Sequence, residues 1–254
     1  SRSKTGKFQG RAKRIMKTAD VIIVGSGASG LFNALFLPQD YKVIVITKKE
    51  VEESDSFLAQ GGISALKNPE DYDSYFEDTM KAGHYENDKG AVEKMIKESP
   101  QIIQDLKDFG VRFDLKDGEI EFTREGGHST FRILHHEDLT GKEITSHLYE
   151  EAKKRDNITI MENCTMIDII EKDGECKGIV YKDADGNLDT IEAPDTVLAT
   201  GGLGGLFKHS TNFRHLTADS LAVCLRHNVE LENINYIQIH PTTFLFKRNQ
   251  EEDS

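Results

Sequence analysis

The first strong pattern along the chain is an apolar run that ends in a glycine-rich turn. Residues 20–30 read DVIIVGSGASG, in which β-branched residues lead directly into Gly25-x-Gly27-x-x-Gly30. A helical stretch with leucines at positions 31, 35 and 37 follows, and a second apolar run occupies 43–46. This order predicts strand, tight turn, helix and strand, which is typical of a dinucleotide-binding unit. A purely structural turn can have the same glycine spacing, but it does not require this context.

The pattern farther along the chain predicts more helices and strands. We expect helices near 71–83, 89–108 and 141–154, the first two ended by Gly83 and Gly110. Thr140 is the expected cap of the third helix, with Glu143 completing a capping box. The expected short strands are 158–162, 165–171, 176–182 and 187–192, with Asp185-Gly186-Asn187 as a hairpin turn.

Two further segments bear on a ligand site. The apolar run 196–199 enters Thr200-Gly201-Gly202 and resembles another parallel strand that ends at the same crevice, with a helix near 217–227 after it. The connection 48–66 is long and rich in small residues, which favours a functional loop. The whole pattern predicts an α/β fold with a Rossmann-like domain.

Charge and composition restrict the partners. The net charge of −12 over 254 residues argues against nucleic acid or an anionic membrane as a main partner, and no stretch approaches a membrane span. Residues 1–19 are basic and contain no acid. A targeting peptide would need an apolar region and a cleavage site, so we expect a disordered leader.

Cysteine and histidine usage gives no metal or disulfide framework. Cys164, Cys176 and Cys224 are widely spaced without a CxxC pair, which fits a reducing cytoplasm. His135 and His136 are adjacent, and in a strand their rings would point to opposite faces, an arrangement poorly suited to chelation.

The identity of the dinucleotide stays open on these grounds. The usual fingerprint has an acidic residue about twenty positions on that binds a ribose hydroxyl. Here the second strand ends in Thr47-Lys48-Lys49, and a lysine at that place also suits the extra phosphate of NADP.

Five motifs in order give a more specific indication. GSGASGL, AQGGISA, TREGGHS, VLATGG and IQIHPTT lie within about residues 20–245, and together they resemble the L-aspartate oxidase family of the succinate dehydrogenase/fumarate reductase flavoprotein superfamily. The resemblance implies FAD. The implied cofactor residues are Gly25, Ser26, Gly27, Ala28, Ser29 and Gly30 at the diphosphate, Lys48 at the adenosine, Asp55, Ser56, Phe57, Leu58, Ala59, Gln60, Gly61 and Gly62 along the flavin, and Thr200, Gly201, Gly202 and Asp219. The family's Gly-Asp-Gly at this last site is Ala218-Asp219-Ser220 here, which makes the local backbone stiffer.

The resemblance also implies a mode of cofactor attachment and a substrate. Relatives with covalent flavin have a histidine five residues before the AQGG glutamine, and this chain has Asp55 there, so the FAD is expected to be noncovalent. Glu125 resembles the acidic residue that recognises the α-amino group of aspartate, although a solvated carboxylate in a Gly-rich loop has the same sequence context. His240 and Thr242 resemble residues that bind a substrate carboxylate.

The implied reaction is FAD-dependent oxidation of L-aspartate to iminoaspartate, with oxygen or fumarate as acceptor. Its product would pass to quinolinate synthase in cytoplasmic NAD biosynthesis, without nucleic acid or membrane partners. A succinate dehydrogenase/fumarate reductase subunit and a non-catalytic FAD-binding module remain alternatives. No catalytic residue is assigned, because the family's catalytic arginine is expected beyond Ser254.

Domain boundaries follow from the same motifs. We expect a basic leader at 1–19, an incomplete FAD-binding domain at 20–235 and the start of a capping domain at 236–254. The chain is therefore expected to be an N-terminal, truncated portion of such an oxidase, and inactivity of that portion alone would follow from uncovered apolar surface.

Overall fold

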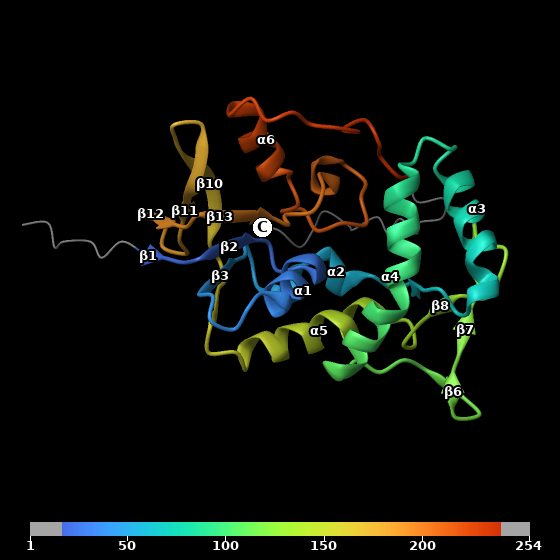
Figure 1. Ribbon diagram of the computed structural model, residues 1–254. Coiled ribbons are helices and arrows are strands. Elements are labelled where there is room, and N and C mark those ends of the chain that lie inside the picture. Colours follow the sequence, from blue (N-terminus) through green and yellow to red (C-terminus); the bar gives the residue numbers. More distant parts are fainter. Residues whose placement is uncertain (1–16, 240–254) are drawn as a thin grey trace, which may run out of the picture.

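A four-stranded parallel sheet lies at the centre of the protein, and the computed structural model describes residues 17–239 (Figure 1). Its strands run in the order β13 (Asp195–Leu198), β2 (Val21–Val24), β3 (Val43–Ile46) and β9 (Ile158–Met161). Every residue of β2 and β3 is buried. A parallel strand covered on both faces needs apolar residues throughout, which explains the continuous runs in the sequence. The predicted strand–turn–helix–strand unit and the parallel strand near 196–199 are confirmed.

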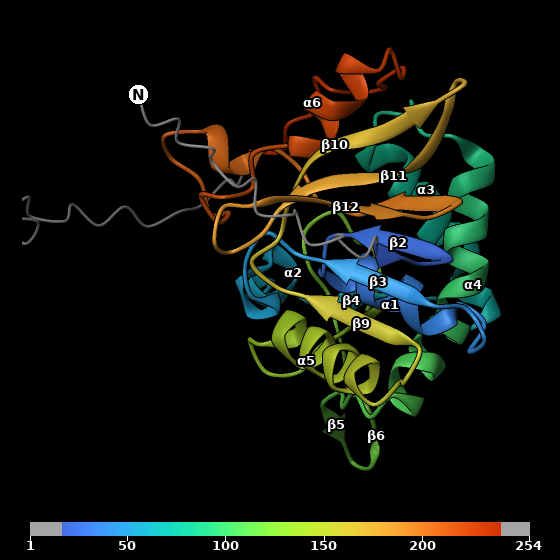
Figure 2. The ribbon, with the colours of Figure 1, turned by 90° about the vertical axis from the view of Figure 1, so that its left-hand side faces the viewer.

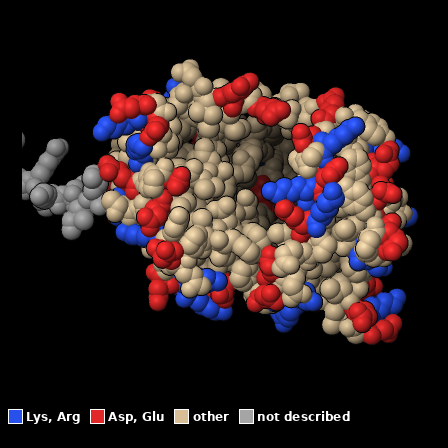
Figure 3. All heavy atoms as spheres, in the orientation of Figure 1, with Lys and Arg blue, Asp and Glu red and all other residues tan. Residues whose placement is uncertain are grey.

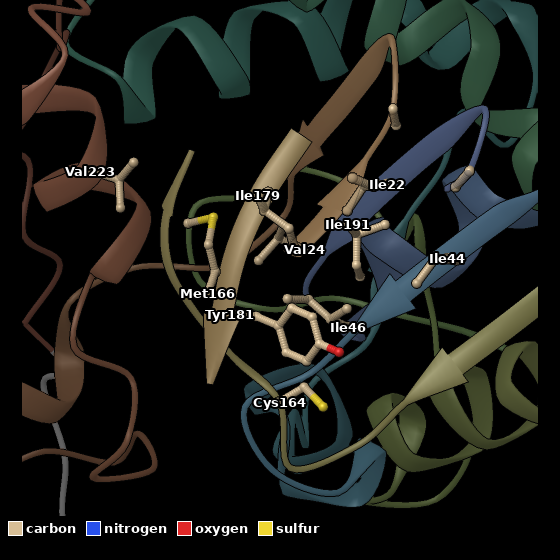
Figure 4. Packing of buried hydrophobic residues seen from close by; sticks show 12 residues of the cluster. Ile22, Val24, Ile44, Ile46, Cys164, Met166, Ile179, Tyr181, Ile191 and Val223 are labelled. Atoms are coloured by element: carbon tan, nitrogen blue, oxygen red, sulfur yellow. The ribbon is translucent and has the colours of Figure 1, made fainter. Parts of the chain in front are cut away.

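An antiparallel meander covers one face of this sheet. It consists of β10 (Thr165–Lys172), β11 (Glu175–Lys182) and β12 (Leu188–Glu192), which confirms the predicted strands and hairpin. Figure 4 shows Ile22 and Ile46 of the parallel sheet packed toward Ile179, Tyr181 and Ile191 of the meander. Each of these five side chains is at most 1% exposed, and full burial of one such side chain stabilises a fold by about 1.5–3 kcal/mol.

Helices cover the other face. Ala34 of α1 (Ala28–Phe36) packs against Ile23 and Val45, and α5 (Thr140–Lys153) packs on α1. In Figure 2 the meander lies above β2, β3 and β9, and α5 lies below them. The two central strands are therefore covered on both faces, whereas the outer strands β13 and β9 contain no fully buried residue. The carboxyl ends of the strands remain available for a site.

The remaining elements stand away from the large sheets or connect them. Figure 1 shows α3 (Tyr72–Ala82) and α4 (Lys89–Asp108) at the end of the molecule opposite the two four-stranded sheets, which confirms the two predicted helices. The other elements are β4 (Ile63–Ser64), β8 (Ile133–Leu134) and β7 (Phe122–Thr123) in a three-stranded sheet, β5 (Leu115–Lys116) with β6 (Glu119–Ile120), α2 (Asp55–Leu58), α6 (Asp219–Arg226), and the 3₁₀ helices Val51–Glu53, Pro69–Asp71 and Gly204–Leu206. Within residues 17–239, no helix has the length and apolarity that a membrane crossing requires.

The predicted capping box at α5 is wrong. The helix begins at Thr140, its N-cap is Leu139, and no side chain caps it. The Thr140 hydroxyl instead accepts a hydrogen bond from the His136 N–H at 3.0 Å, and Glu143 accepts one from the Arg112 N–H at 3.0 Å. Both side chains that the local pattern assigned to the cap therefore accept hydrogen bonds from backbone N–H groups outside the helix.

The expected disordered leader is also wrong at its C-terminal end. Lys17–Thr18 form β1, which pairs in parallel with β12, and Ala19 is buried. The Lys17 ammonium contacts the Tyr181 hydroxyl, so a remote strand orders these residues. Residues 1–16, the rest of the expected leader, lie outside the described part of the chain.

Candidate functional site

The glycine-rich turn joins β2 to α1 and leaves no space for side chains at two positions. Gly25 has a φ of +116°, and a Cβ there would lie 2.1 Å from the Ala199 carbonyl oxygen of the neighbouring strand end. A Cβ at Gly30 would lie 2.0 Å from the Gly25 carbonyl oxygen. The turn is thus compressed between the end of β13 and the first turn of α1, and only glycine fits.

The first turn of α1 is suited to an anion. Gly27 is its N-cap and contributes no capping side chain, while the Ala28 N–H donates to the Ser56 hydroxyl at 3.0 Å. The other N–H groups of a first turn have no partner within the helix, and the helix dipole adds positive partial charge there. A phosphate is the ligand that this arrangement favours.

A cavity of about 580 Å³ opens in front of this turn, at the carboxyl ends of β2, β3 and β13. The expected cofactor residues that line it are Gly25, Ser26, Gly27, Ser29, Lys48, Asp55, Ser56, Thr200, Gly201 and Asp219. Figure 3 shows that this face of the molecule is hollowed near its centre, with uncharged residues on the left of the hollow and charged residues on its right. The cavity has the volume of a small-molecule or cofactor site.

Part of the cavity wall was missed by sequence reasoning. Cys164 and Met166 contribute from the start of β10, and Cys224 contributes from α6. Burial raises the pKa of the Cys164 thiol, so this group is an uncharged wall residue rather than a thiolate. These residues belong to no motif, and only the packing of the meander and α6 brings them to the glycine turn.

Lys48 is held by residues 167 to 171 positions farther along the chain. Its ammonium donates to Asp219 Oδ2 at 2.6 Å, to the Thr217 hydroxyl at 2.8 Å and to the His215 carbonyl oxygen at 2.9 Å. An ammonium has three donors, so these acceptors use all of them. The carboxylate of Asp219 also balances the charge, which argues against Lys48 as the partner of an NADP phosphate.

Ala218, just before Asp219, has the backbone that the family's glycine would favour. Its φ is +55° and its ψ is 40°, the left-handed conformation, at the N-cap of α6. The sequence Ala-Asp-Ser is expected to make this backbone stiffer. In addition, Ala218 adopts a left-handed conformation that costs an L-residue about 1–2 kcal/mol.

Only the first two residues of the expected flavin segment, 55–62, line this cavity. Asp55 and Ser56 lie at the cavity, and Asp55 Oδ1 accepts a hydrogen bond from the Phe213 N–H at 3.1 Å. The remaining expected residues that do not line this cavity are Ala28, Gly30, Phe57, Leu58, Ala59, Gln60, Gly61, Gly62 and Gly202. Gly62 has a structural role, because a Cβ there would lie 2.3 Å from the Leu134 carbonyl oxygen, and glycine lets the backbone pass close to β8.

Glu125 lies beside Gly61. A Cβ on Gly61 would be 3.3 Å from Glu125 Oε1, although the two residues are far apart in sequence. The loop between β7 and β8, which contains Glu125, also borders a second cavity of about 540 Å³, lined by Gly126, Gly127 and His128 together with residues of β4, α3 and α4. The structure thus brings the candidate substrate residue next to the candidate flavin segment. His240 and Thr242 lie outside the described residues.

The strand arrangement considered for His135 and His136, with their rings on opposite faces, does not apply. Both follow β8 rather than lie in it, and their Nδ1 atoms are 3.2 and 3.3 Å from the two carboxylate oxygens of Asp114. Nearby, burial would raise the pKa of Glu143, but hydrogen bonds from Arg112 bring it below its usual value. Even so, no group of three or more His, Cys, Asp or Glu within residues 17–239 could hold a metal ion. The three cysteines are free thiols.

Comparison with known proteins gives consistent results. A family model described as FAD binding domain matches residues 20–252. The L-aspartate oxidase of Clostridium perfringens is 45% identical over 92% of this chain, and that of Clostridium acetobutylicum is 46% identical over 91%. The chain covers 53% and 54% of those two proteins, so it spans about half the length of the curated relatives it matches.

A solved structure extends the likeness to three dimensions. The quinol fumarate reductase of E. coli matches with a TM-score of 0.79 and 28% identity, over 84% of this chain and 38% of that one. A dinucleotide also fits this site on physical grounds. The site combines the glycine turn, the N-terminus of α1 without a capping side chain, and the adjoining cavity. The chain therefore belongs to the FAD binding domain family, and its fold is that of the succinate dehydrogenase and fumarate reductase flavoproteins.

Proposed function

We propose that the cavity at the glycine turn holds FAD without a covalent bond. The backbone from Gly25 to Gly30 would hold the diphosphate, since the first turn of α1 offers N–H donors and positive partial charge. Asp55 stands where covalent relatives have histidine, and its carboxylate is already an acceptor for the Phe213 N–H. Bound FAD supplies the capacity to accept two electrons.

We further propose that the substrate is L-aspartate and the product iminoaspartate, so that the whole protein is an L-aspartate oxidase. The observation that carries this proposal is the Glu125 carboxylate beside Gly61. A carboxylate there would bind an α-ammonium group through a charge-assisted hydrogen bond, which separates aspartate from succinate. The names of the two clostridial relatives give independent support.

The roles of the remaining candidates belong to the same proposal. His240 and Thr242 would bind a substrate carboxylate, and the boundary between FAD-binding and capping domains would fall near 235. No residue of this chain is assigned as general acid or base. The product would enter quinolinate and NAD synthesis in the cytoplasm, with oxygen or fumarate as electron acceptor.

A respiratory subunit that oxidises succinate is the less favoured alternative. Both substrates carry two carboxylates, but succinate has no ammonium group, so it gives the Glu125 carboxylate no attractive partner. In addition, Asp55 cannot form the histidyl flavin bond of the covalent relatives.

Spectral titration of the FAD-loaded protein tests the proposal. We expect aspartate to perturb the flavin spectrum at much lower concentration than succinate, and Glu125→Gln to weaken the aspartate response by about 10- to 100-fold. Glu119→Gln is the matched control, because Glu119 is an exposed carboxylate on β6. A wild-type protein that responds to succinate and not to aspartate would exclude the proposed specificity.

A further inference from the structure

We infer that Arg132 is a positioning residue that fixes the loop carrying Glu125, an inference that rests on the proposed function. The Arg132 side chain is 0% exposed, and a buried charge must be compensated by partners. Its Nε and Nη2 donate to the two carboxylate oxygens of Asp71 at 2.9 and 2.8 Å. Its Nη1 donates to Asp78 Oδ2 at 2.6 Å. The guanidinium therefore joins two carboxylates that both come from the region of α3.

The same carboxylates hold the loop between β7 and β8. Asp78 Oδ2 accepts from the Ser129 N–H at 2.7 Å and from the Ser129 hydroxyl at 2.8 Å. Asp71 Oδ1 accepts from the Thr130 hydroxyl at 2.6 Å. Since each acceptor is held in place by Arg132, the guanidinium sets where the returning half of the loop lies.

His128 is the third point of attachment. Its Nδ1 lies 3.1 Å from Arg132 Nη1, and a guanidinium can only donate, so Nδ1 must accept and the ring proton must be on Nε2. The His128 N–H in turn donates to the Glu125 carbonyl oxygen at 3.3 Å, which links this anchored histidine to Glu125.

Arg132 also fixes the other side of the Glu125 contact. Its carbonyl oxygen accepts from the Ala65 N–H at 3.1 Å, directly after β4. The segment 61–64 that precedes this bond contains Gly61, the residue against which the Glu125 carboxylate lies. One residue thus holds the loop through its side chain and the facing segment through its backbone.

Substitution by lysine separates the roles of charge and geometry. Arg132→Lys keeps a cation but cannot make the bidentate contact or reach His128 at the same time. We expect the Ser129 amide to exchange its hydrogen about tenfold faster, and the His128 ring to lose its fixed tautomer in ¹⁵N NMR spectra. Arg124→Lys is the matched control: Arg124 lies in the same loop, exposed, with its side chain over the Phe131 ring.

The second measurement is ligand selectivity in the FAD-loaded protein. Arg132→Lys should weaken aspartate binding about tenfold while leaving succinate binding within twofold, the same pattern as Glu125→Gln. Unchanged exchange at Ser129 would overturn the inference, and so would faster exchange with unchanged selectivity. If the wild-type protein does not prefer aspartate, the proposed function fails, and the exchange of Ser129 alone then decides whether Arg132 fixes the loop.

Discussion

Alanine substitutions at two glycines of the same turn should have very different effects on the fold. At Gly25 the φ of +116° is strained for any L-residue, and the new methyl group would lie 2.1 Å from the Ala199 carbonyl oxygen. Relief requires the end of β13 to move away from β2, where the Ala199 N–H donates to the Val24 carbonyl oxygen at 2.8 Å. Gly27, with φ −67° and ψ 178°, has a backbone that alanine adopts freely.

The magnitude for Gly25→Ala combines two contributions. Residues held in such sparsely populated backbone regions cost about 1–3 kcal/mol, and loss of one backbone hydrogen bond costs about 1 kcal/mol. We therefore expect a loss of about 3 kcal/mol, which for a chain of this size lowers the melting temperature by about 6–12 °C.

Gly27→Ala is the internal control. Its methyl group would lie 2.9 Å from the Ser56 hydroxyl, a side-chain atom that can rotate away, so its cost is the hydrogen bond from the Ala28 N–H, about 1 kcal/mol. The lower entropy of the unfolded alanine chain offsets about 0.4–1 kcal/mol of this. Thermal denaturation followed by circular dichroism measures both variants without cofactor. A Gly25→Ala protein that melts within 3 °C of the wild type (roughly 1 kcal/mol) would refute the reasoning.

The other two predictions concern ion pairs. Lys48→Met should lower the free energy of unfolding by only about 1 kcal/mol, because the side chains of the Lys48–Asp219 pair are about one-third exposed. A double-mutant cycle with Asp219→Asn, measured by urea unfolding, should give a coupling energy of the same size. The Arg132 guanidinium lowers the pKa of Asp71 from 3.8 to about 2, so this carboxylate stabilises the fold above pH 4 and loses that contribution as the pH falls toward 2. The contribution is about 2 kcal/mol. In urea unfolding, the difference between wild type and Asp71→Asn should therefore shrink from pH 6 to pH 2.5, and a constant difference would contradict the assignment.

Several features could be predicted because they depend on neighbours in sequence. The strand–turn–helix unit at 21–36 needs a β-branched run, three glycines at fixed spacing and a helix former, all within one short segment. The helices Tyr72–Ala82 and Lys89–Asp108 likewise carry their own signals, including Asp88, whose side chain accepts from the Ala91 N–H.

Other features could not be predicted from local patterns. Thr140 and Glu143 match a capping box, but the His136 and Arg112 N–H groups compete successfully for them. Lys17 reads as part of a basic tail, yet a two-residue strand forms because β12 offers a free edge. The partners of Glu143 and Lys17 are distant in sequence, whereas His136 is only four residues from Thr140 but lies outside the helix.

The sequence by itself determined the dinucleotide turn, the order of helices and strands, and the motifs that relate this chain to flavoproteins. Only the tertiary structure decided that Lys48 is neutralised by Asp219, that Cys164 and Cys224 complete the cavity wall, and that Glu125 lies against Gly61. It also decided that Arg132, an arginine outside every motif of the sequence, is a buried centre of charge. The physical reason is that backbone conformation follows from adjacent residues, whereas burial and charge neutralisation depend on groups that only folding brings within a few ångströms.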